Sequence, residues 1–542
     1  MQVARLWRTV RHLKPRQVVG RLRFRLSRPR IDLRAAPEVA PRNGDWIAML
    51  DRAPSLLGAA RFRFLNVERD LDGTGWDDET VEKLWRYNLH YFDDLNATPQ
   101  PERREQQRAL LQRWMREVVP GVGTGWEPYP VSLRVVNWIK WLLRDEPAPS
   151  GLLPSLAVQV RWLSRKLEWH LLGNHLFVNA KALYFAGHFF AGEEAEGWRK
   201  LSAGILRSQL PEQIRPDGGQ FELSPMYHAL ALEDVLDLIN LHVAYPEERV
   251  ARLNTGELRE VAGRMLRWLR IMHLGDDRPG FFNDTARGIA PALPSLERYA
   301  ARLGVVAASL ESEGQEVLAD SGYVRLSRGP AVVLLDVARV GPDYLPGHAH
   351  ADTLSFEFAL DSRPVIVNGG TSCYGDSADR QRERGTAAHS TVTVANQNSS
   401  EVWSGFRVGR RARPFDLVRG EWTVACSHDG YRWLRGAPVH RRQWTLGPNE
   451  LRIEDRVTPA TRPAVARFIL APGLRIGAAG AGRWSVREGD SEIARLIVEA
   501  GDARTVPATC ATEFGKIDDV DCLEVNIAEG SSVLRIQWGG ST

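Results

Sequence analysis

The chain has 542 residues, more than a single hydrophobic core usually supports, so two or three domains are expected. Apolar residues make up 43% of the sequence, which is enough to fill those cores and excludes a disordered protein. The formal net charge is only +4, and both signs are mixed along most of the chain, which argues against a nucleic-acid-binding protein.

The first 34 residues form a strongly basic arm, in which ten arginine and lysine residues precede the first acidic residue, Asp32. Leu6, Val10 and Leu13 fall at helical spacing opposite arginines, so the arm either makes peripheral contact with an anionic membrane or packs against its own domain. Packing against the domain is favoured, because two prolines would interrupt a long surface helix. Residues 1–77 are assigned to this arm and the lead-in to the next domain.

The sequence also bears on location and on cysteine chemistry. Its four cysteines include no CxxC pair, so a thiolate zinc site is not expected and no disulfide is implied. No apolar run approaches the length needed to span a bilayer, and arginines interrupt the continuous apolar stretch that a secretory signal requires. We therefore expect a cytoplasmic or inner-membrane-associated protein.

Between residues 78 and 315 the apolar residues recur at intervals of three and four, which predicts an all-helical domain. A stripe from Leu156 to Leu171 predicts one helix of more than four turns, which opens at Pro154 and closes at Gly173. Twelve of the eighteen tryptophans precede residue 270, which favours an aromatic-lined groove between helical hairpins. Further helices are expected at 176–190, 199–210, 228–244 and 256–272.

The spacing of apolar residues changes near residue 318 from three and four to two. Residues 318–542 are therefore expected to form an antiparallel β-sandwich that follows the helical domain. Apolar side chains alternate with others between Leu354 and Leu360, and a turn then leads into Val365–Val367. Other strands are expected at 323–326, 331–337, 391–394, 443–446, 451–453, 466–470 and 533–538.

Asn174 and His175 follow the glycine that ends one predicted helix and precede the next helix. The favoured interpretation of this dipeptide alone is that Asn174 is an N-cap. The alternative is that a side-chain amide at a helix start, near unpaired backbone N–H groups, holds a carboxylate or an oxyanion.

A second polar stretch runs from Asp217 to His228, with the sequence Asp-Gly-Gly-Gln-Phe-Glu-Leu-Ser-Pro-Met-Tyr-His. In one interpretation Glu222 and Ser224 cap a helix and Tyr227 packs in the core. The density of hydrogen-bonding side chains favours another, in which Tyr227 lies near cations, loses its proton more readily than in water, and acts as base or acid.

His348 and His350 precede a predicted strand, and alternation along an extended segment places both imidazoles on one face. Such a pair forms a metal site, a catalytic site or one of each. Because zinc needs at least three ligands, His389 and a residue near the end of the strand Val365–Val367 are the candidates for the others.

Together these motifs resemble the bacterial heparinase II/III-type polysaccharide lyases, especially relatives found among genes for extracellular polysaccharides. The resemblance covers about residues 80–420. It implies an N-terminal incomplete (α/α) toroid followed by a C-terminal antiparallel β-sandwich, with the cleft between them. It also gives the periplasm as an alternative location. The motifs that carry it are Asn174–His175, Asp217–His228, Gly347–Asp352, Arg380–His389 and Glu401–Arg411.

Such lyases cleave the glycosidic bond beside a uronic acid by β-elimination, so the resemblance implies an acidic polysaccharide as the partner. It implies that Asn174 and His175 neutralise the uronate carboxylate and that Tyr227 protonates the leaving oxygen. His348 would be the base for one C5 stereochemistry, whereas Tyr227 would be both base and acid for the other.

The resemblance also implies a substrate-binding set and one structural zinc. Position 368 is Asn368, where relatives usually carry an aspartate, so the expected metal site has one anionic ligand fewer. Ser390 stands where an asparagine is common. The substrate-binding residues would be Glu222, His228, Arg380 and Arg384, with a structural role as the alternative for the two arginines, and the metal ligands would be His350, Asn368 and His389.

Two other function classes stay open. A glycoside hydrolase on a similar toroid would use Asp217 and Glu222 as its carboxylate pair. A non-catalytic sugar-binding or assembly protein would keep the fold without the reaction. Elimination leaves an unsaturated uronate that absorbs in the ultraviolet and hydrolysis does not, so product absorbance separates the enzymes.

Overall fold

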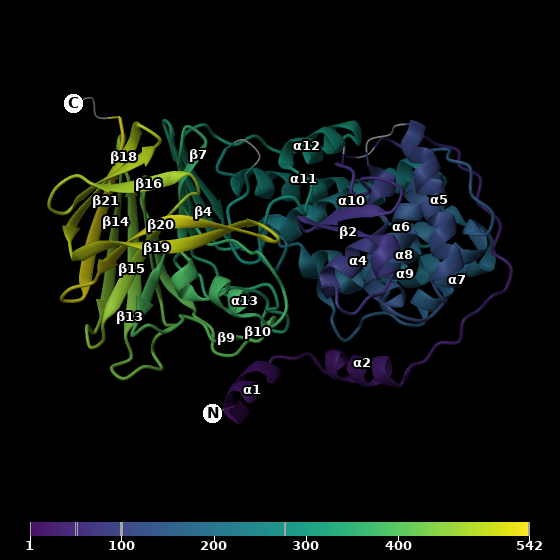
Figure 1. Cartoon of the computed structure of the whole chain (residues 1–542), viewed down its shortest axis with the longest axis horizontal. Helices are drawn as coiled ribbons and strands as arrows, with labels where there is room; N and C mark the ends of the chain where they lie inside the picture. Colours follow the sequence, from purple (N-terminus) through teal and green to yellow (C-terminus); the bar gives the residue numbers. More distant parts are fainter. Residues whose placement is uncertain (1, 49, 51, 98–100, 276–277, 540–542) are drawn as a thin grey trace.

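Two large domains lie side by side in a computed structural model, which describes residues 2–48, 50, 52–97, 101–275 and 278–539 (Figure 1). The helical domain comes first and the strands follow. The N-terminal part is an incomplete (α/α) toroid and the C-terminal part an antiparallel β-sandwich, so the predicted fold class is confirmed. The predicted domain boundaries at residues 77, 315 and 318 stay predictions; the last toroid helix ends at Arg302 and the first sandwich strand begins at Gly314.

The toroid is entered through a small hairpin, β1 (Arg61–Phe64) and β2 (Val67–Asp70), and the short helix α3 (Leu71–Thr74). Its helices are α4 (Lys83–Tyr91), α5 (Pro101–Glu117), α6 (Pro128–Leu142), α7 (Leu152–Ser164), α8 (Gly173–Phe189), α9 (Gly192–Gln213), α10 (Pro225–Ala244), α11 (Thr255–Ile271) and α12 (Leu293–Arg302), with the 3-10 turns η1 (Asp93–Asn96) and η2 (Thr124–Trp126).

The long helix predicted from Pro154 to Gly173 is shorter than expected, because α7 stops at Ser164. The chain then folds back, and the backbone N–H of Glu168 donates to the side chain of Asn179 on α8 at 2.9 Å. This tertiary contact overrides the apolar periodicity and turns the Glu168 carboxylate toward the start of α8.

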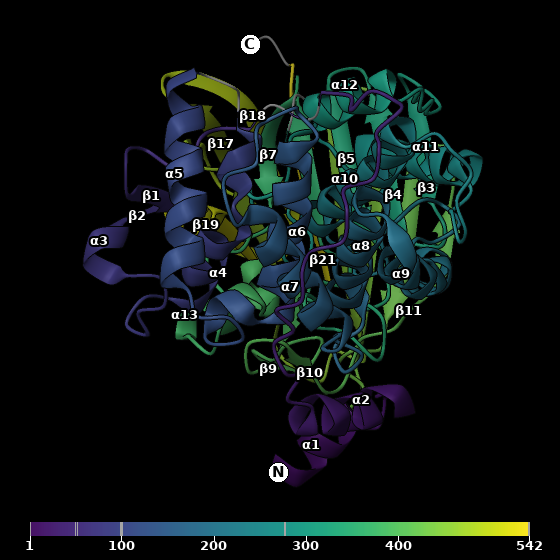
Figure 2. The same ribbon diagram turned by 90° about the vertical axis from the view of Figure 1, so that its right-hand side faces the viewer.

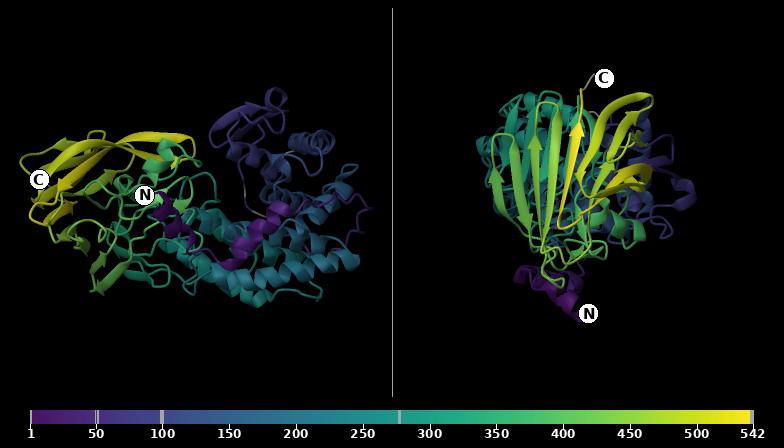
Figure 3. Two further views of the ribbon diagram at one scale, coloured as in Figure 1. Left: turned by 90° about the horizontal axis from the view of Figure 1, so that it is seen from below. Right: turned by 90° about the vertical axis from the view of Figure 1, so that its left-hand side faces the viewer.

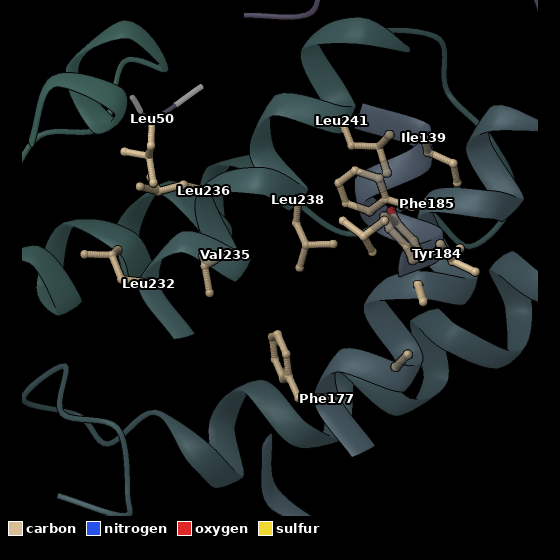
Figure 4. Packing of buried hydrophobic residues seen from close by; sticks show 14 of the residues in the cluster. Leu50, Ile139, Phe177, Tyr184, Phe185, Leu232, Val235, Leu236, Leu238 and Leu241 are labelled. Atoms are coloured by element: carbon tan, nitrogen blue, oxygen red, sulfur yellow. The ribbon is translucent and has the colours of Figure 1, made fainter. Parts of the chain in front are cut away.

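Apolar side chains of the toroid helices form one continuous core, part of which is drawn in Figure 4. Tyr184 and Phe185 on α8 pack there with Leu238 and Leu241 on α10 and Ile139 on α6. The tryptophans do not support the expected aromatic-lined groove, because most of them fill this core instead. Nine of the twelve early tryptophans are buried: Trp76, Trp85, Trp114, Trp126, Trp138, Trp141, Trp162, Trp198 and Trp268.

The sandwich consists of two large antiparallel sheets that enclose a second core. One has the order β11-β12-β13-β14-β21-β18-β17-β16, and the other β19-β20-β15-β7-β6-β5-β4-β3, with β8 also paired to β15. The register of the β13–β14 pair sets Trp444 opposite Ile453, so both face the core.

The strands and small elements of this domain have the following bounds: β3 (Gly314–Leu318), β4 (Tyr323–Arg328), β5 (Ala331–Asp336), β6 (Phe356–Leu360), β7 (Arg363–Val367), α13 (Ala378–Glu383), η3 (Thr386–Ala388), β8 (Val392–Val394), β9 (Val402–Trp403), β10 (Arg407–Val408), β11 (Pro414–Arg419), β12 (Thr423–His428), β13 (Val439–Leu446), β14 (Glu450–Thr458), β15 (Ala464–Leu470), β16 (Leu474–Ala478), β17 (Arg483–Glu488), β18 (Ser491–Ala500), β19 (Asp502–Glu513), β20 (Lys516–Asn526) and β21 (Ser531–Gln537).

The basic arm forms two helices, α1 (Gln2–Val10) and α2 (Pro15–Leu26), which lie along the underside of both domains (Figures 2 and 3). Arg8 makes a two-pronged ion pair with Glu401 of the sandwich domain at 2.8 and 2.9 Å. Arg16 pairs with Glu212 at the end of α9 at 2.8 Å. The interpretation that the arm packs against its own protein is therefore confirmed.

The domains also meet through a hairpin that projects from the sandwich. The turn between β19 and β20 reaches the β1–β2 turn, where Asn66 donates to Glu513 at 3.0 Å and to the Phe514 carbonyl at 2.9 Å.

All four cysteines are free. Among the described residues, no helix combines the length and apolar character needed to cross a membrane.

Candidate active site

Two predicted residues from different domains are in direct contact where the toroid meets the sandwich. Tyr227 lies in the first turn of α10, which Ser224 caps by accepting a hydrogen bond from the Tyr227 N–H at 3.2 Å. His348 lies in the loop between β5 and β6. The two ring centroids are 3.9 Å apart and the planes are inclined by 30°. Both side chains keep some exposure to solvent.

Asp284, in the loop between α11 and α12, organises the histidines. One carboxylate oxygen lies 2.8 Å from His348 Nδ1, and the other lies 2.8 Å from His350 Nε2. Arg380 of α13 donates to both oxygens, at 2.7 Å from Nη2 to Oδ2. Burial works against this charge, but Arg380 and the two imidazoles outweigh it and hold the pKa of Asp284 well below its usual value.

This arrangement fixes the tautomer of His348. Because the ionised Asp284 can only accept, Nδ1 of His348 must carry a proton, so the neutral ring would have its lone pair on Nε2. Nε2 lies 3.5 Å from the Oε2 atom of Glu222, a buried oxygen with no hydrogen-bond partner among the described residues. Burial raises the pKa of the Glu222 carboxyl, although His348 opposes the shift. Asp284 thus orients the His348 imidazole, and in the neutral form of the ring Nε2 is the acceptor atom.

Tyr227 has the opposite protonation tendency to the one predicted. Its hydroxyl lies 2.8 Å from the hydroxyl of Tyr374. Burial first, and then the neighbouring Tyr374, raise the pKa of the Tyr227 phenol well above its usual value. The direction of this shift is opposite to a readily lost proton, because burial and the neighbouring phenols favour the neutral form, and Arg380, which lies over the Tyr374 ring, is paired with Asp284. A phenol in this state is suited to donating a proton.

Asn174 and His175 form the toroid side of the site. The N-cap of α8 is Leu172, with φ of 63°, so Asn174 lies inside the first turn and the interpretation of it as an N-cap is wrong. His175 Nδ1 lies 3.1 Å from Glu168, and its ring packs on Tyr129 at 4.5 Å.

Charge connects this pair to the rest of the site. Burial disfavours protonation of His175, but the carboxylates of Glu168, Glu222 and Glu127 outweigh it, so the pKa of His175 is raised. Glu222 also interacts electrostatically with His348, and Tyr129 with Tyr227. Electrostatic interactions therefore connect His175 and His348 to Glu222, and Tyr227 lies against His348, while Asn174 precedes His175 in the first turn of α8.

Removing the Glu168 carboxylate should lower the pKa of His175, because this group is the main source of the raised value. The imidazole is charged below its pKa and neutral above it, so Glu168→Gln should make His175 lose its charge at a lower pH than in the parent. NMR titration of ¹³C-labelled histidine, assigned with His175→Gln, measures this. A partly exposed control on α9, Glu196→Gln, should leave the His175 titration unchanged, and an unmoved His175 titration in Glu168→Gln would contradict the assignment.

Two family models match the chain on both sides of this site. The family model described as "Heparinase II/III-like, C-terminal" matches residues 311–526, and "Heparinase II/III N-terminus" matches residues 150–292. The chain belongs to the heparinase II/III-type family. The N-terminal match includes Asn174, His175 and Tyr227, and the C-terminal match includes His348.

Two heparin-sulfate lyases are among the relatives of this heparinase II/III-type chain. The one from Bacteroides stercoris is 26% identical over 310 residues, which cover 52% of this chain and 45% of the relative. The one from Pedobacter heparinus is 27% identical over 310 residues, covering 50% and 44%. The chain thus matches less than half the length of these relatives. A crystal structure of heparinase III has the same fold, with a TM-score of 0.68 and 16% identity over 86% of this chain and 80% of that one.

The heparinase II/III-type metal positions are only partly suited to a metal. His350 Nδ1 and His389 Nε2 face each other at 3.0 Å, while the second nitrogen of each ring is fixed by Asp284 and by the Gly385 carbonyl. His350 Nε2 and His389 Nδ1 both donate a hydrogen bond, so in two neutral rings the nitrogens that face each other would each carry a lone pair. This arrangement is typical of metal-binding histidines.

Asn368 does not complete this pair. Its Oδ1 accepts the Ser390 N–H at 3.1 Å and its amide donates to Ser355 at 3.3 Å. Within the described ranges, no three His, Cys, Asp or Glu side chains are grouped to hold a metal ion. The two imidazoles therefore fit a cation, whereas the third position supplies no anionic ligand.

Three predicted substrate-binding residues are structural instead. His228 is fully buried, accepts the Gln220 N–H at 3.1 Å and donates to the Met265 carbonyl at 2.8 Å, and burial lowers its pKa to about 3. Arg380 is buried against Asp284, and Arg384 donates to the carbonyls of the loops around it. No donor of these side chains faces solvent, so the assignment to substrate binding is corrected. The fourth, Glu222, faces His348 rather than solvent.

Sequence reasoning missed Asp284, Glu168 and Tyr374. Asp284 follows Asn283 in a loop 64 residues from its partner His348, so no spacing rule connects them. Glu168 was missed because the predicted helix ran on to Gly173, which placed this residue within a helix rather than in the loop after α7. Tyr374 lies between Gly370 and the motif that begins at Arg380, and its position before that motif was the one available signal.

Proposed function

We propose that this protein is a polysaccharide lyase that cleaves a uronic-acid-containing polysaccharide by β-elimination. The observation that carries the proposal is the contact between Tyr227 and His348, with the His348 tautomer fixed by Asp284. It joins an oriented proton acceptor to a protonated phenol, the two groups that an elimination needs. The heparin-sulfate lyases among the relatives support the same reaction class.

In the proposed reaction, Asn174 and the charged form of His175 bind the uronate carboxylate and neutralise the negative charge that develops on it. Nε2 of His348 removes the proton from C5. The electrons of that C–H bond form the C4–C5 double bond, and the C4–O bond breaks. Tyr227 protonates the departing oxygen. One well-placed donor to the carboxylate contributes roughly a hundredfold to a thousandfold in rate.

His348 is the favoured base, because its free nitrogen is set by Asp284 whereas Tyr227 is held protonated. The same two rings would also permit the other stereochemistry, in which Tyr227 serves as both base and acid. Substrates of opposite C5 configuration distinguish these routes, since His348→Ala should stop cleavage only of the one that needs the imidazole.

The hydrolase alternative is not favoured. Asp217 would have to be one of its two carboxylates, but Ser321 donates to it from both N–H and hydroxyl, at 2.7 and 2.9 Å. The other, Glu222, is buried beside His348. Asp217 therefore acts as a support for its loop rather than as an acid or nucleophile.

A panel of uronate-containing polysaccharides tests the proposal, with a neutral glucan as control. We expect ultraviolet absorbance to rise with at least one acidic polymer and never with the glucan. New reducing ends without absorbance would indicate hydrolysis. Binding of a polymer with neither product would indicate the sugar-binding or assembly protein.

We also propose a loosely held cation between His350 and His389. Their facing nitrogens support it, and the neutral Asn368 accounts for weak binding. Zinc should be lost on dialysis against a chelator, whereas Asn368→Asp should retain it by supplying the missing anionic ligand. Elemental analysis after dialysis measures this. If neither protein takes up zinc when it is added, the proposal is wrong.

The location is likewise a proposal: the cytoplasm or the inner membrane surface, where the basic arm would make a peripheral contact, with the periplasm as the alternative. Cell fractionation with compartment markers distinguishes the three.

A further inference from the structure

The basic arm, residues 2–34, carries an unusual share of the exposed apolar surface. Large apolar side chains on α1 that face outward include Val3, Leu6 and Trp7, the last of them 64% exposed. On α2 they include Leu22 and Leu26, at 59% and 82%. Within the described residues, ten of the 24 exposed large apolar side chains lie between positions 3 and 33. Soluble surfaces scatter such side chains, so this concentration marks an interaction site.

The exposed apolar residues form one stripe on each helix. Positions 3, 6, 7 and 10 recur at three and four on α1, and positions 18, 22 and 26 recur at four on α2. Both helices lie on the same side of the molecule, beneath the two domains (Figures 1 and 2). Their stripes therefore face away from the body together.

Inward contacts hold the arm in this orientation. Gly20 packs so closely on the toroid that a Cβ there would lie 2.9 Å from the backbone of Trp169 and His170. The Phe24 ring packs against His170 with the centroids 4.2 Å apart and the planes tilted by 36°, and Lys166 donates to the Phe24 carbonyl at 2.6 Å. The inner faces are thus satisfied by the protein itself, which leaves the outer stripes without a partner among the described residues.

The charge beside the stripes indicates what covers them. The arm holds eleven basic residues and one acidic residue. Six exposed arginines form no ion pair with any described residue: Arg11, Arg21, Arg23, Arg25, Arg28 and Arg30. A second copy of this chain would bring the same positive charge and repel it. An apolar stripe bordered by unpaired arginines instead matches an anionic lipid surface, which offers both phosphate groups and acyl chains.

We propose that α1 and α2 form a membrane-docking surface, in which the apolar stripes enter the interface of an anionic bilayer and the arginines bind lipid phosphates. The protein would then be a peripheral membrane protein, held by its underside. This inference goes beyond the lyase proposal and does not depend on it, because docking requires no residue of the candidate active site.

Co-sedimentation of the full chain with vesicles tests the surface. The parent should bind phosphatidylcholine vesicles that contain phosphatidylglycerol, bind pure phosphatidylcholine at least tenfold more weakly, and release as salt rises. The triple variant Trp7→Ser, Leu22→Ser, Leu26→Ser should lose at least tenfold in binding, since it removes apolar area and leaves every arginine in place.

A matched triple variant controls for general loss of apolar surface. Val250, Val306 and Ile517 are exposed at 54%, 86% and 43% and lie outside the arm, so their change to serine should leave vesicle binding unaltered. Circular dichroism melting verifies that each variant folds. Parent protein that ignores the anionic vesicles, or an arm variant that binds them like the parent, overturns the proposal. So does light scattering that shows a dimer which the arm variant abolishes, because the stripes would then bind a second copy.

Discussion

Tyr227→Phe is expected to lower kcat for elimination by a factor of about 10²–10⁴, the usual contribution of a positioned proton donor, while KM changes little. The ring should stay stacked on His348, since the 3.9 Å contact does not involve the hydroxyl. What is lost is the proton that the leaving oxygen needs. Ultraviolet-monitored kinetics on the best substrate of the panel measures the effect.

Tyr374→Phe is the matched control for this change. Tyr374 offers the other hydroxyl of the 2.8 Å pair, so removing it takes away one partner of Tyr227 but not the donor itself. We expect a loss of less than tenfold. Equal activity of Tyr227→Phe and the parent would rule out the proposed role, and a larger loss in Tyr374→Phe would transfer that role to Tyr374.

The fold class and the main proton-transfer groups could be predicted, because each depends on local sequence. Apolar residues at every third or fourth position mark a helix, and apolar residues at every second position mark a strand, wherever only one face is buried. Strand β13 shows the second pattern. Tyr227 and His348 belong to compact polar motifs, which a reader of the sequence can find without knowing that the two rings touch. Their contact links residues from two domains and needed the structure.

The errors have a common physical origin, which is that residue type does not reveal what a side chain contacts. His228 and Arg380 are residue types that bind acidic sugars, yet both form their hydrogen bonds with buried protein groups, His228 with the Met265 carbonyl and Arg380 with Asp284. Tyr227 was expected to lie near cations, but burial and the neighbouring Tyr374 dominate its surroundings and raise its pKa. Helix α7 stops early because Glu168 finds a partner on α8, a contact that periodicity does not encode.

Asp284→Asn is the second change with a large expected effect, because it alters stability and activity through different partners. Arg380 would be left fully buried without its counter-charge, which should lower the free energy of unfolding by about 3–5 kcal/mol. The asparagine NH₂ must also face either His348 or His350. Facing His348 it would donate to Nδ1 and force the proton onto Nε2, the atom proposed to act as base.

The double variant Asp284→Asn, Arg380→Leu separates the two effects. Removing the unpaired guanidinium should recover part of the lost stability, as measured by denaturant unfolding, because no buried charge then remains uncompensated. It should not recover kcat, because an asparagine can turn either its NH₂ or its oxygen toward His348 and no longer fixes the tautomer. Recovery of kcat together with stability would show that Asp284 only supports the fold. Low kcat in a restabilised protein, with KM close to that of the parent, would instead identify Asp284 as the positioning residue for the base.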